Sequence, residues 1–221
     1  MVSKEYKKYT KEWRKGMGDW YAVQSPNWKL RAAFWGGIIP IIRDKTESLS
    51  VCEVGGGCGY NLNAIGLYYK PKKITRAVNI EPSDAMRLFC EKTYYDMEVK
   101  DGTVDKLPLK DQEIDLMVSC GLLLHIPKED LPQALSEIFR CAKKYVVIIE
   151  YWAENEEPQF EHDGFDAYTV PHWNRDYEKP IADLGVPFQL RLTVPFIIKS
   201  EMDDGTTRQH TQRGYFYERQ T

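Results

Sequence analysis

The sequence has no apolar run of about eighteen residues, no C-x-x-C pair, no internal repeat and no low-complexity linker. Because the N-terminus is charged and no run is long enough to cross a bilayer, we expect neither secretion nor membrane insertion. The five cysteines are scattered, and several fall within apolar patterns, which is typical of small buried side chains in a reducing, cytoplasmic compartment. The net charge of −3 provides no general field that would attract nucleic acid or an anionic membrane.

The chain of 221 residues alternates strand-like and helix-like segments from about residue 49 onward. We predict strands at residues 49–54, 74–81, 97–100, 113–119 and 144–151, and helices at 60–69, 83–94 and 128–143. Two further β-like runs, 188–198 and 207–219, flank the turn signal Asp203-Asp-Gly205. The pattern predicts an α/β fold with a doubly wound, mainly parallel, seven-stranded sheet and a C-terminal antiparallel hairpin.

A glycine-rich turn follows the first predicted strand. Gly55, Gly57 and Gly59 stand at every second position after Glu53, and a helix is predicted to begin near Tyr60. Glycines let the backbone turn sharply and approach a ligand closely, and a helix start directs free N–H groups to the same place. The spacing G-x-G-x-G differs from the G-x-G-x-x-G of dinucleotide-binding loops. The alternative is a plain connection between a strand and a helix.

Polar residues follow the next strands at the same edge of the sheet. Glu81-Pro82 ends the second strand, where a carboxylate can accept hydrogen bonds from both ribose hydroxyls of a nucleoside. The alternative for Glu81 is an exposed residue that caps the next helix. Ser119 and Gly121 lie at the carboxyl end of the fourth strand, which is where open α/β sheets bind ligands.

Together, Glu53, the glycines and Glu81 resemble the S-adenosylmethionine site of class I methyltransferases. More narrowly, the chain resembles the methylases associated with pseudaminic acid biosynthesis in Trp13-Arg-Lys-Gly-Met-Gly-Asp-Trp-Tyr21, in Glu53 to Leu62, in Cys120 to Pro127, in Glu150-Tyr151 and in Asn174 to Tyr177. The resemblance implies S-adenosylmethionine as cofactor, adenine contacts at Thr103 and Val104, and further cofactor contacts at Asn61, Trp13 and Tyr21. The chain departs from that family at Gln24-Ser25 and in a longer 152–173 segment.

Four residues are candidates for catalysis: His125, Tyr151, His162 and His172. His125 follows the fourth strand, and an unperturbed imidazole titrates at about pH 6.5, so it could take a proton from an acceptor. The alternative is a loop histidine that hydrogen-bonds to the backbone. Because His162, Asp163 and His172 show no recognisable ligand spacing, we expect no metal.

We expect one methyltransferase domain over residues 1–221: an N-terminal helical lid (1–45), a cofactor-binding core (46–151), a substrate-covering loop (152–187) and the C-terminal hairpin (188–221). The first segment carries Tyr6, Tyr9 and Trp13 at helical spacing among many lysines. A nucleic-acid or membrane element is the alternative interpretation of this basic, aromatic helix.

The leading functional hypothesis is methyl transfer from S-adenosylmethionine to a small polar acceptor, such as a sugar or amino sugar, with no nucleic-acid or membrane partner. A Rossmann-type NAD-dependent oxidoreductase and a non-catalytic, cofactor-bound interaction module are the alternatives. The sequence leaves the oligomeric state open.

Overall fold

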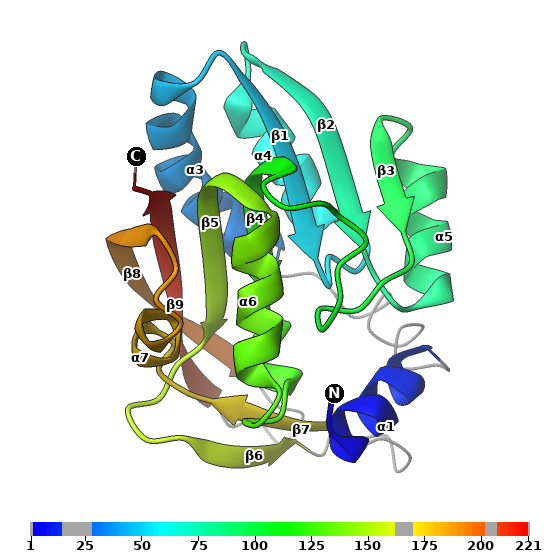
Figure 1. Ribbon diagram of the computed structural model, residues 1–221, viewed down its shortest axis with the longest axis vertical. Helices are drawn as coiled ribbons and strands as arrows, with labels where there is room; N and C mark the ends of the chain where they lie inside the picture. The colour runs from blue at the N-terminus through cyan, green and yellow to red at the C-terminus, as the bar shows by residue number, and fades with distance from the viewer. Residues whose placement is uncertain (1, 15–27, 162–169, 202–206, 221) are drawn as a thin grey trace.

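The computed structural model describes residues 2–14, 28–161, 170–201 and 207–220 (Figure 1). Seven strands form one mixed sheet in the order β3-β2-β1-β4-β5-β9-β8. The first five strands in the sequence are β1 (Ser48–Val54), β2 (Lys73–Ile80), β3 (Met97–Lys100), β4 (Ile114–Cys120) and β5 (Ala142–Tyr151). They run parallel, whereas β8 (Phe188–Glu201) and β9 (Thr207–Arg219) are antiparallel. This arrangement confirms the predicted fold class.

Helices cover both faces of the sheet, as a doubly wound fold requires. On one face, α3 (Trp28–Lys45) and α4 (Tyr60–Tyr69) pack on β1, β4 and β5 around the fully buried Trp35. On the other face lie α6 (Leu131–Cys141) and α7 (Glu178–Asp183), while α5 (Asp84–Thr93) packs against β3. The strands β1, β4 and β5 are almost wholly buried because both of their faces are covered.

Two expectations for the helices need correction. The helix predicted at 128–143 is shorter, because residues 127–130 form a turn in which Asp130 N donates to Pro127 O. Its last two positions belong to β5, which begins at Ala142 without an intervening loop. The sequence pattern at 27–43 also predicts a helix that kinks or ends at Pro40; α3 contains Pro40 and continues to Lys45, so the helix does not end there. Ser83 caps the amino end of α5, since its hydroxyl accepts from Met86 N.

The segment 152–187 was predicted to be a loop, and that prediction is wrong in part. Strands β6 (Glu157–Glu161) and β7 (Val170–Asn174) pair antiparallel as a separate two-stranded sheet, and α7 follows them. This small sheet and α1 (Lys4–Glu12) both lie at the end of the large sheet where β1, β4 and β5 terminate (Figure 1). The carboxyl ends of the parallel strands are therefore covered by two segments that are far apart in sequence.

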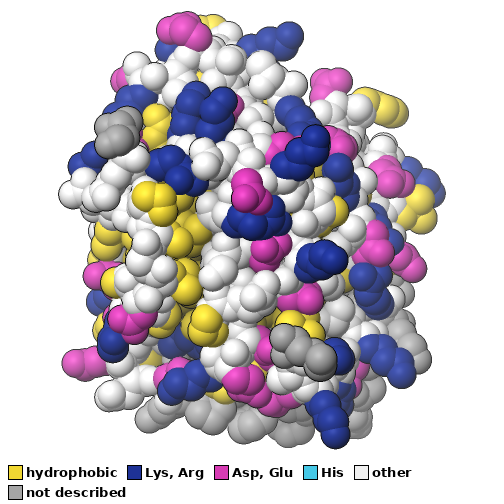
Figure 2. Space-filling view, viewed as in Figure 1, with side chains coloured by type: hydrophobic (Ala, Val, Ile, Leu, Met, Phe, Trp, Pro, Cys, Tyr) yellow, Lys and Arg dark blue, Asp and Glu magenta, His cyan; other side chains and the backbone are white. Residues whose placement is uncertain are grey.

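The surface carries no strong charge of one sign on the face in view. Figure 2 shows Lys and Arg side chains interspersed with Asp and Glu over this face, which agrees with the small net charge. Within the described ranges, no helix is long and apolar enough to cross a membrane.

Candidate active site

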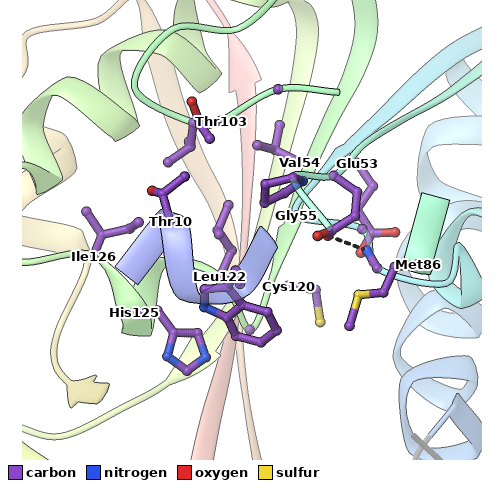
Figure 3. A pocket seen from close by; sticks show the side chains of 18 of the residues that line it. Thr10, Glu53, Val54, Gly55, Met86, Thr103, Cys120, Leu122, His125 and Ile126 are labelled. Carbon is purple, nitrogen blue, oxygen red and sulfur yellow. Dashed lines mark hydrogen bonds between the residues drawn. The ribbon is translucent and has the colours of Figure 1, made fainter. Parts of the chain in front are cut away.

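A pocket opens at the carboxyl ends of β1, β2 and β4, under α1. Its lining comes from these strands, from the loops and helices that follow them and from α1. Figure 3 shows Glu53 and Met86 on one side of the pocket and Thr10, His125 and Ile126 on the other. The residues on its wall that were predicted to bind cofactor are Trp13, Glu53, Gly55, Gly57, Asn61, Glu81, Pro82, Thr103, Val104 and Gly121.

The glycine turn brings bare backbone to the pocket floor. Gly55 and Gly57 have φ values of +66° and +53°, a left-handed region that side chains with a Cβ rarely adopt. A Cβ on the intervening Gly56 would lie 2.3 Å from Asn79 Oδ1. The amide of Asn79 in turn donates to Gly57 O at 2.8 Å, so the second strand holds the turn in place.

Glu81 joins the glycine turn to the start of α5. Its Oε2 accepts from Gly57 N at 3.0 Å and its Oε1 accepts from Ser83 N at 2.8 Å. Each carboxylate oxygen has a second lone pair, so the side chain keeps acceptor capacity toward the pocket that it lines. Burial raises the pKa of Glu81, against the lowering effect of these two backbone hydrogen bonds. Backbone N–H groups therefore fix the position of the Glu81 carboxylate, which can still accept hydrogen bonds from the two ribose hydroxyls of a nucleoside.

Glu53 and Asn61 belong to one buried hydrogen-bond chain. Trp35 Nε1 donates to Asn61 Oδ1 at 3.2 Å, and Asn61 Nδ2 donates to Glu53 Oε1 at 2.6 Å. The indole thereby fixes the orientation of the amide, because its N–H can only donate. Asn61 thus orients the Glu53 carboxylate at the pocket wall, which gives the residue a defined place in the site.

Thr103 and Val104 form the wall of the pocket beside the end of β3. Val104 is buried, and Thr103 pairs with Lys106 in an isolated bridge that closes the turn. The hydroxyl of Tyr6, from α1, donates to Asp105 Oδ1 at 3.0 Å directly behind this turn. Burial raises the pKa of Tyr6, so the hydroxyl stays protonated and keeps its donor.

Helix α1 is tied down across the mouth of the pocket at both ends. Ser3 N donates to Asp130 Oδ1 at 2.9 Å, and the Ser3 hydroxyl bonds to the other oxygen of the same carboxylate. Just after the helix, Arg14 Nη1 lies 2.8 Å from Asp101 Oδ1. Tyr6, Tyr9, Thr10 and Trp13 line the pocket between these anchors. The sequence places Tyr6, Tyr9 and Trp13 at helical spacing, but of these only Trp13 was predicted to contact the cofactor. Tyr6, Tyr9 and Thr10 are site residues that the sequence did not predict.

A chain of aromatic rings runs from α1 to the small sheet. The Trp13 ring lies 5.5 Å from His125, and His125 lies 6.5 Å from His172 on β7. His172 lies 6.3 Å from Tyr151 at the end of β5, and Tyr9 contacts Trp173 at 6.4 Å. The structure therefore brings three of the four predicted catalytic residues together, although only His125 lies on the pocket wall.

Several predicted site residues lie elsewhere. Gly59 (φ +78°) starts α4, and a Cβ there would lie 2.8 Å from Cys90 Sγ, so the residue is needed for packing and does not line the pocket. Ser119 is buried behind the wall, where its hydroxyl bonds to Glu150. Tyr151 and the buried His172 stand one layer behind His125. Tyr21 and His162 lie outside the described residues.

Residues 52–149 match the family model described as a methyltransferase domain. Among solved structures, the chain is similar to magnesium protoporphyrin IX methyltransferase from Synechocystis PCC 6803 with bound S-adenosylmethionine (12% identity, 99% of both chains, TM-score 0.67). It is also similar to a chain of the complex between the Haloferax volcanii Trm112 methyltransferase activator and the putative methyltransferase (18% identity, 100% of this chain and 98% of that one, TM-score 0.64). A third is a putative methyltransferase from Bacillus halodurans C-125 (14% identity, 83% and 97%, TM-score 0.61).

No curated protein sequence matches the chain. Because these three structures are each below 20% identical to the chain, they establish the fold and leave the acceptor open. The matched domain supports methyl transfer as the reaction. The glycine turn and the Glu81 carboxylate, which the backbone holds in place, suit a nucleoside in the pocket. The chain carries a methyltransferase domain at residues 52–149 and has the Rossmann-like class I fold, and the cofactor that these findings support is S-adenosylmethionine.

Proposed function

We propose that the methyl acceptor is a small polar molecule, such as a sugar or amino sugar, bound between α1, the segment Gly121–His125 and β7. The observation that carries this proposal is the ring chain from Trp13 through His125 to His172. Its first two members, Trp13 and His125, line the same pocket as Glu81, so an acceptor bound beside the cofactor would contact these rings. The motif resemblance to the pseudaminic acid-associated methylases supports the sugar class.

Bound S-adenosylmethionine supplies a methyl group on a positively charged sulfur. The residues of this chain have to hold an acceptor atom in line with that methyl group and exclude water. Positioning alone can contribute roughly 7–11 kcal/mol to lowering the barrier. Trp13 and Tyr9 from α1 would cover the site, and the rings of Trp13 and His125 would pack on the apolar faces of an acceptor.

His125 is the proposed general base. It is half-buried, lies on the pocket wall and is the last residue of the short 3₁₀ turn that follows β4. If the acceptor atom is a hydroxyl oxygen, its proton would pass to the imidazole as the oxygen bonds to the methyl carbon and the carbon–sulfur bond breaks. An ammonium nitrogen would first have to lose a proton to the imidazole, because only the neutral amine has the lone pair that attacks. His172 and Tyr151 are proposed to orient the His125 ring from behind, since both belong to the same ring chain.

Helix α1 is proposed to be a lid over the cofactor. Its anchors, Ser3 to Asp130 and Arg14 to Asp101, lie on loops at opposite sides of the pocket mouth. Release of either anchor would widen the access to the space under Thr10 and Trp13. The partly exposed ion pair at Arg14 is the weaker of the two, because exposed pairs contribute only about 0–1 kcal/mol.

The acceptor class can be tested with methyl-labelled S-adenosylmethionine and a panel of acceptors. The panel should hold free sugars, amino sugars, nucleotide-linked sugars, planar aromatic carboxylic acids and total RNA. We expect label in the sugar or amino-sugar arm, with the product gaining one methylene in mass, and no transfer by a His125→Ala variant that still binds cofactor. Label confined to the planar aromatic arm or to RNA would refute the proposed class while leaving the methyltransferase activity intact.

A further inference from the structure

The segment from Gly121 to Ile126 connects the two ends of the pocket. At its start, Leu122 packs against the glycine turn, since a Cβ on Gly55 would lie only 3.0 Å from Leu122 Cδ1. At its end, His125 contacts Trp13 and His172. Between them, η2 (Leu123–His125) is a single 3₁₀ turn. Any displacement of this segment would therefore move both the cofactor floor and the proposed base.

A buried carboxylate holds the first half of this segment. Glu150 lies near the end of β5 and is 0% exposed. Its Oε1 accepts from Leu122 N at 3.0 Å and Leu123 N at 2.9 Å, and its Oε2 accepts from Leu124 N at 3.3 Å. Three consecutive backbone donors at the start of a helical turn, which otherwise lack partners, thus converge on one side chain. The negative charge also complements the positive end of the turn.

A buried guanidinium holds the other end. Arg175 is 2% exposed, and its Nη2 donates to Ile126 O at 3.1 Å, just after the turn. Its Nη2 also lies 3.6 Å from Glu156 Oε1. A cation at the carboxyl end of a turn is as favourable as an anion at the amino end. The segment is therefore clamped by opposite charges that come from β5 and from the end of β7.

Burying Glu150 and Arg175 is not an efficient way to raise the free energy of unfolding. Buried ions lose their hydration, and replacing a buried pair by apolar residues is often neutral or stabilising. Four acceptor sites on an ionised carboxylate, however, can order three successive amides in a single geometry, which an amide or an apolar side chain cannot do. We propose that Glu150 is a positioning residue for methyl transfer, which with Arg175 fixes the segment Gly121–Ile126 so that Leu122 supports the cofactor turn and His125 faces the acceptor.

The ionisation of Glu150 has a direct consequence for this clamp. Burial raises the pKa of Glu150 to about 7, although its hydrogen bonds act in the opposite direction. Once protonated, one of its oxygens becomes a donor and can no longer serve all three amides. Tyr177, beyond β7, interacts electrostatically with Glu150, and Arg213 lies opposite Glu150 on β9. The other titratable and charged groups of this cluster surround Tyr177: Arg175, Tyr215 and Glu156. We expect the segment to be held firmly above about pH 7 and to loosen below it.

Amide hydrogen exchange on the full chain tests this without any acceptor, so it does not depend on the proposed acceptor class. The variant is Glu150→Gln, which keeps the shape but offers one acceptor oxygen. We expect the protection factor of Leu124 to fall by at least about tenfold in the variant, with smaller losses at Leu122 and Leu123. In the unmodified protein, protection at these amides should rise as the pH passes through about 7, and in the variant it should not.

Asp115→Asn is a matched control. Asp115 also accepts from a backbone amide, Ser50 N at 3.0 Å, but it lies at the opposite end of β4. It should leave exchange at residues 122–124 unchanged. If Glu150→Gln shows the same protection and the same pH profile as the unmodified protein, the positioning role is refuted. If that variant does not fold, the pH profile of the unmodified protein decides: protection that does not change between about pH 5.5 and about pH 8.5 overturns the proposal.

Discussion

The floor of the pocket is built from polar groups whose hydrogen bonds are already made within the fold, whereas its cover is built from rings. On the floor, Glu81 accepts from Gly57 N and Ser83 N, and Asn79 donates to Gly57 O, at 2.8–3.0 Å. On the cover, Trp13, His125 and His172 meet edge to face at centroid distances of 5.5 Å and 6.5 Å. Hydrogen bonds fix direction more strictly than ring contacts do.

The difference matters because the two walls have different tasks. Because the cofactor has the same structure in every reaction cycle, a rigid set of hydrogen-bond donors and acceptors can bind it. An acceptor must enter and leave, and a wall of rings can exclude water while it moves as a unit. The floor should therefore respond to mutation through cofactor affinity, and the cover should respond through turnover.

The largest expected effect is on the floor. Glu81→Ala removes a charged acceptor for the ribose hydroxyls, and each such hydrogen bond contributes about 1.5–3 kcal/mol. We predict that affinity for S-adenosylmethionine falls by at least about tenfold, and by about a hundredfold if both bonds are lost. Calorimetric titration measures this. Glu98→Ala, on the neighbouring strand β3, removes a half-exposed carboxylate remote from the pocket wall and should leave the affinity unchanged.

Glu150, which holds the segment between the floor and the cover, should change how the free energy of unfolding depends on pH. Glu150 has a folded-state pKa of about 7, above its ordinary value, so its protonated form is favoured by folding. That stabilising contribution is complete below the ordinary glutamate pKa and is lost as the pH rises through about 7. Relative to the unmodified protein, Glu150→Gln should therefore gain roughly 1–3 kcal/mol in unfolding free energy between about pH 5 and about pH 8. Denaturant titrations at both pH values measure the difference, and a constant difference would contradict the assigned titration.

A backbone substitution on the floor should have a smaller effect. Gly57→Val places a β-branched residue at φ +53°, where the strain costs about 1–3 kcal/mol and the new methyl groups intrude on the ligand. We expect about tenfold weaker binding of S-adenosylmethionine. Gly66→Val is the matched control, because a Cβ there meets nothing within 4 Å. Equal affinities for the two variants would show that the turn does not touch the cofactor.

The smallest effect is expected on the lid. Because α1 is already held by Ser3 and Tyr6, binding of S-adenosylhomocysteine should slow amide exchange in Lys4–Glu12 by only a few-fold. Exchange in the remote helix α3 should not change. If α1 gains no protection, it is a fixed part of the wall and does not open.

The floor could be predicted from sequence because its parts are local. Strand, glycine turn, helix and next strand follow one another, and parallel pairing places Glu53 beside Asn79 and both next to the turn. The cover could not be predicted in the same way. Pro158 and Pro171 lie within β6 and β7, and prolines lower the strand signal, so the pairing of these strands was missed.

Charged residues buried by tertiary contacts were equally hard to foresee. Arg175 follows β7 in a polar stretch, and nothing in its neighbours indicates that its guanidinium is buried against Ile126 O. Glu150 was noticed only as part of a motif, because its three amide partners lie 26–28 residues earlier in the chain. Sequence patterns carry local geometry well, and they do not carry contacts between distant segments.

The most direct test of the division between floor and cover is a paired measurement on His172→Phe, which keeps a ring in the buried position on β7. Cofactor affinity is measured by calorimetry, and turnover is measured with the acceptor found in the labelled-methyl panel. We predict that turnover falls by at least about tenfold while the dissociation constant for S-adenosylmethionine stays within about threefold of the unmodified protein. Unchanged turnover per folded molecule, together with weakened cofactor binding, would contradict the account.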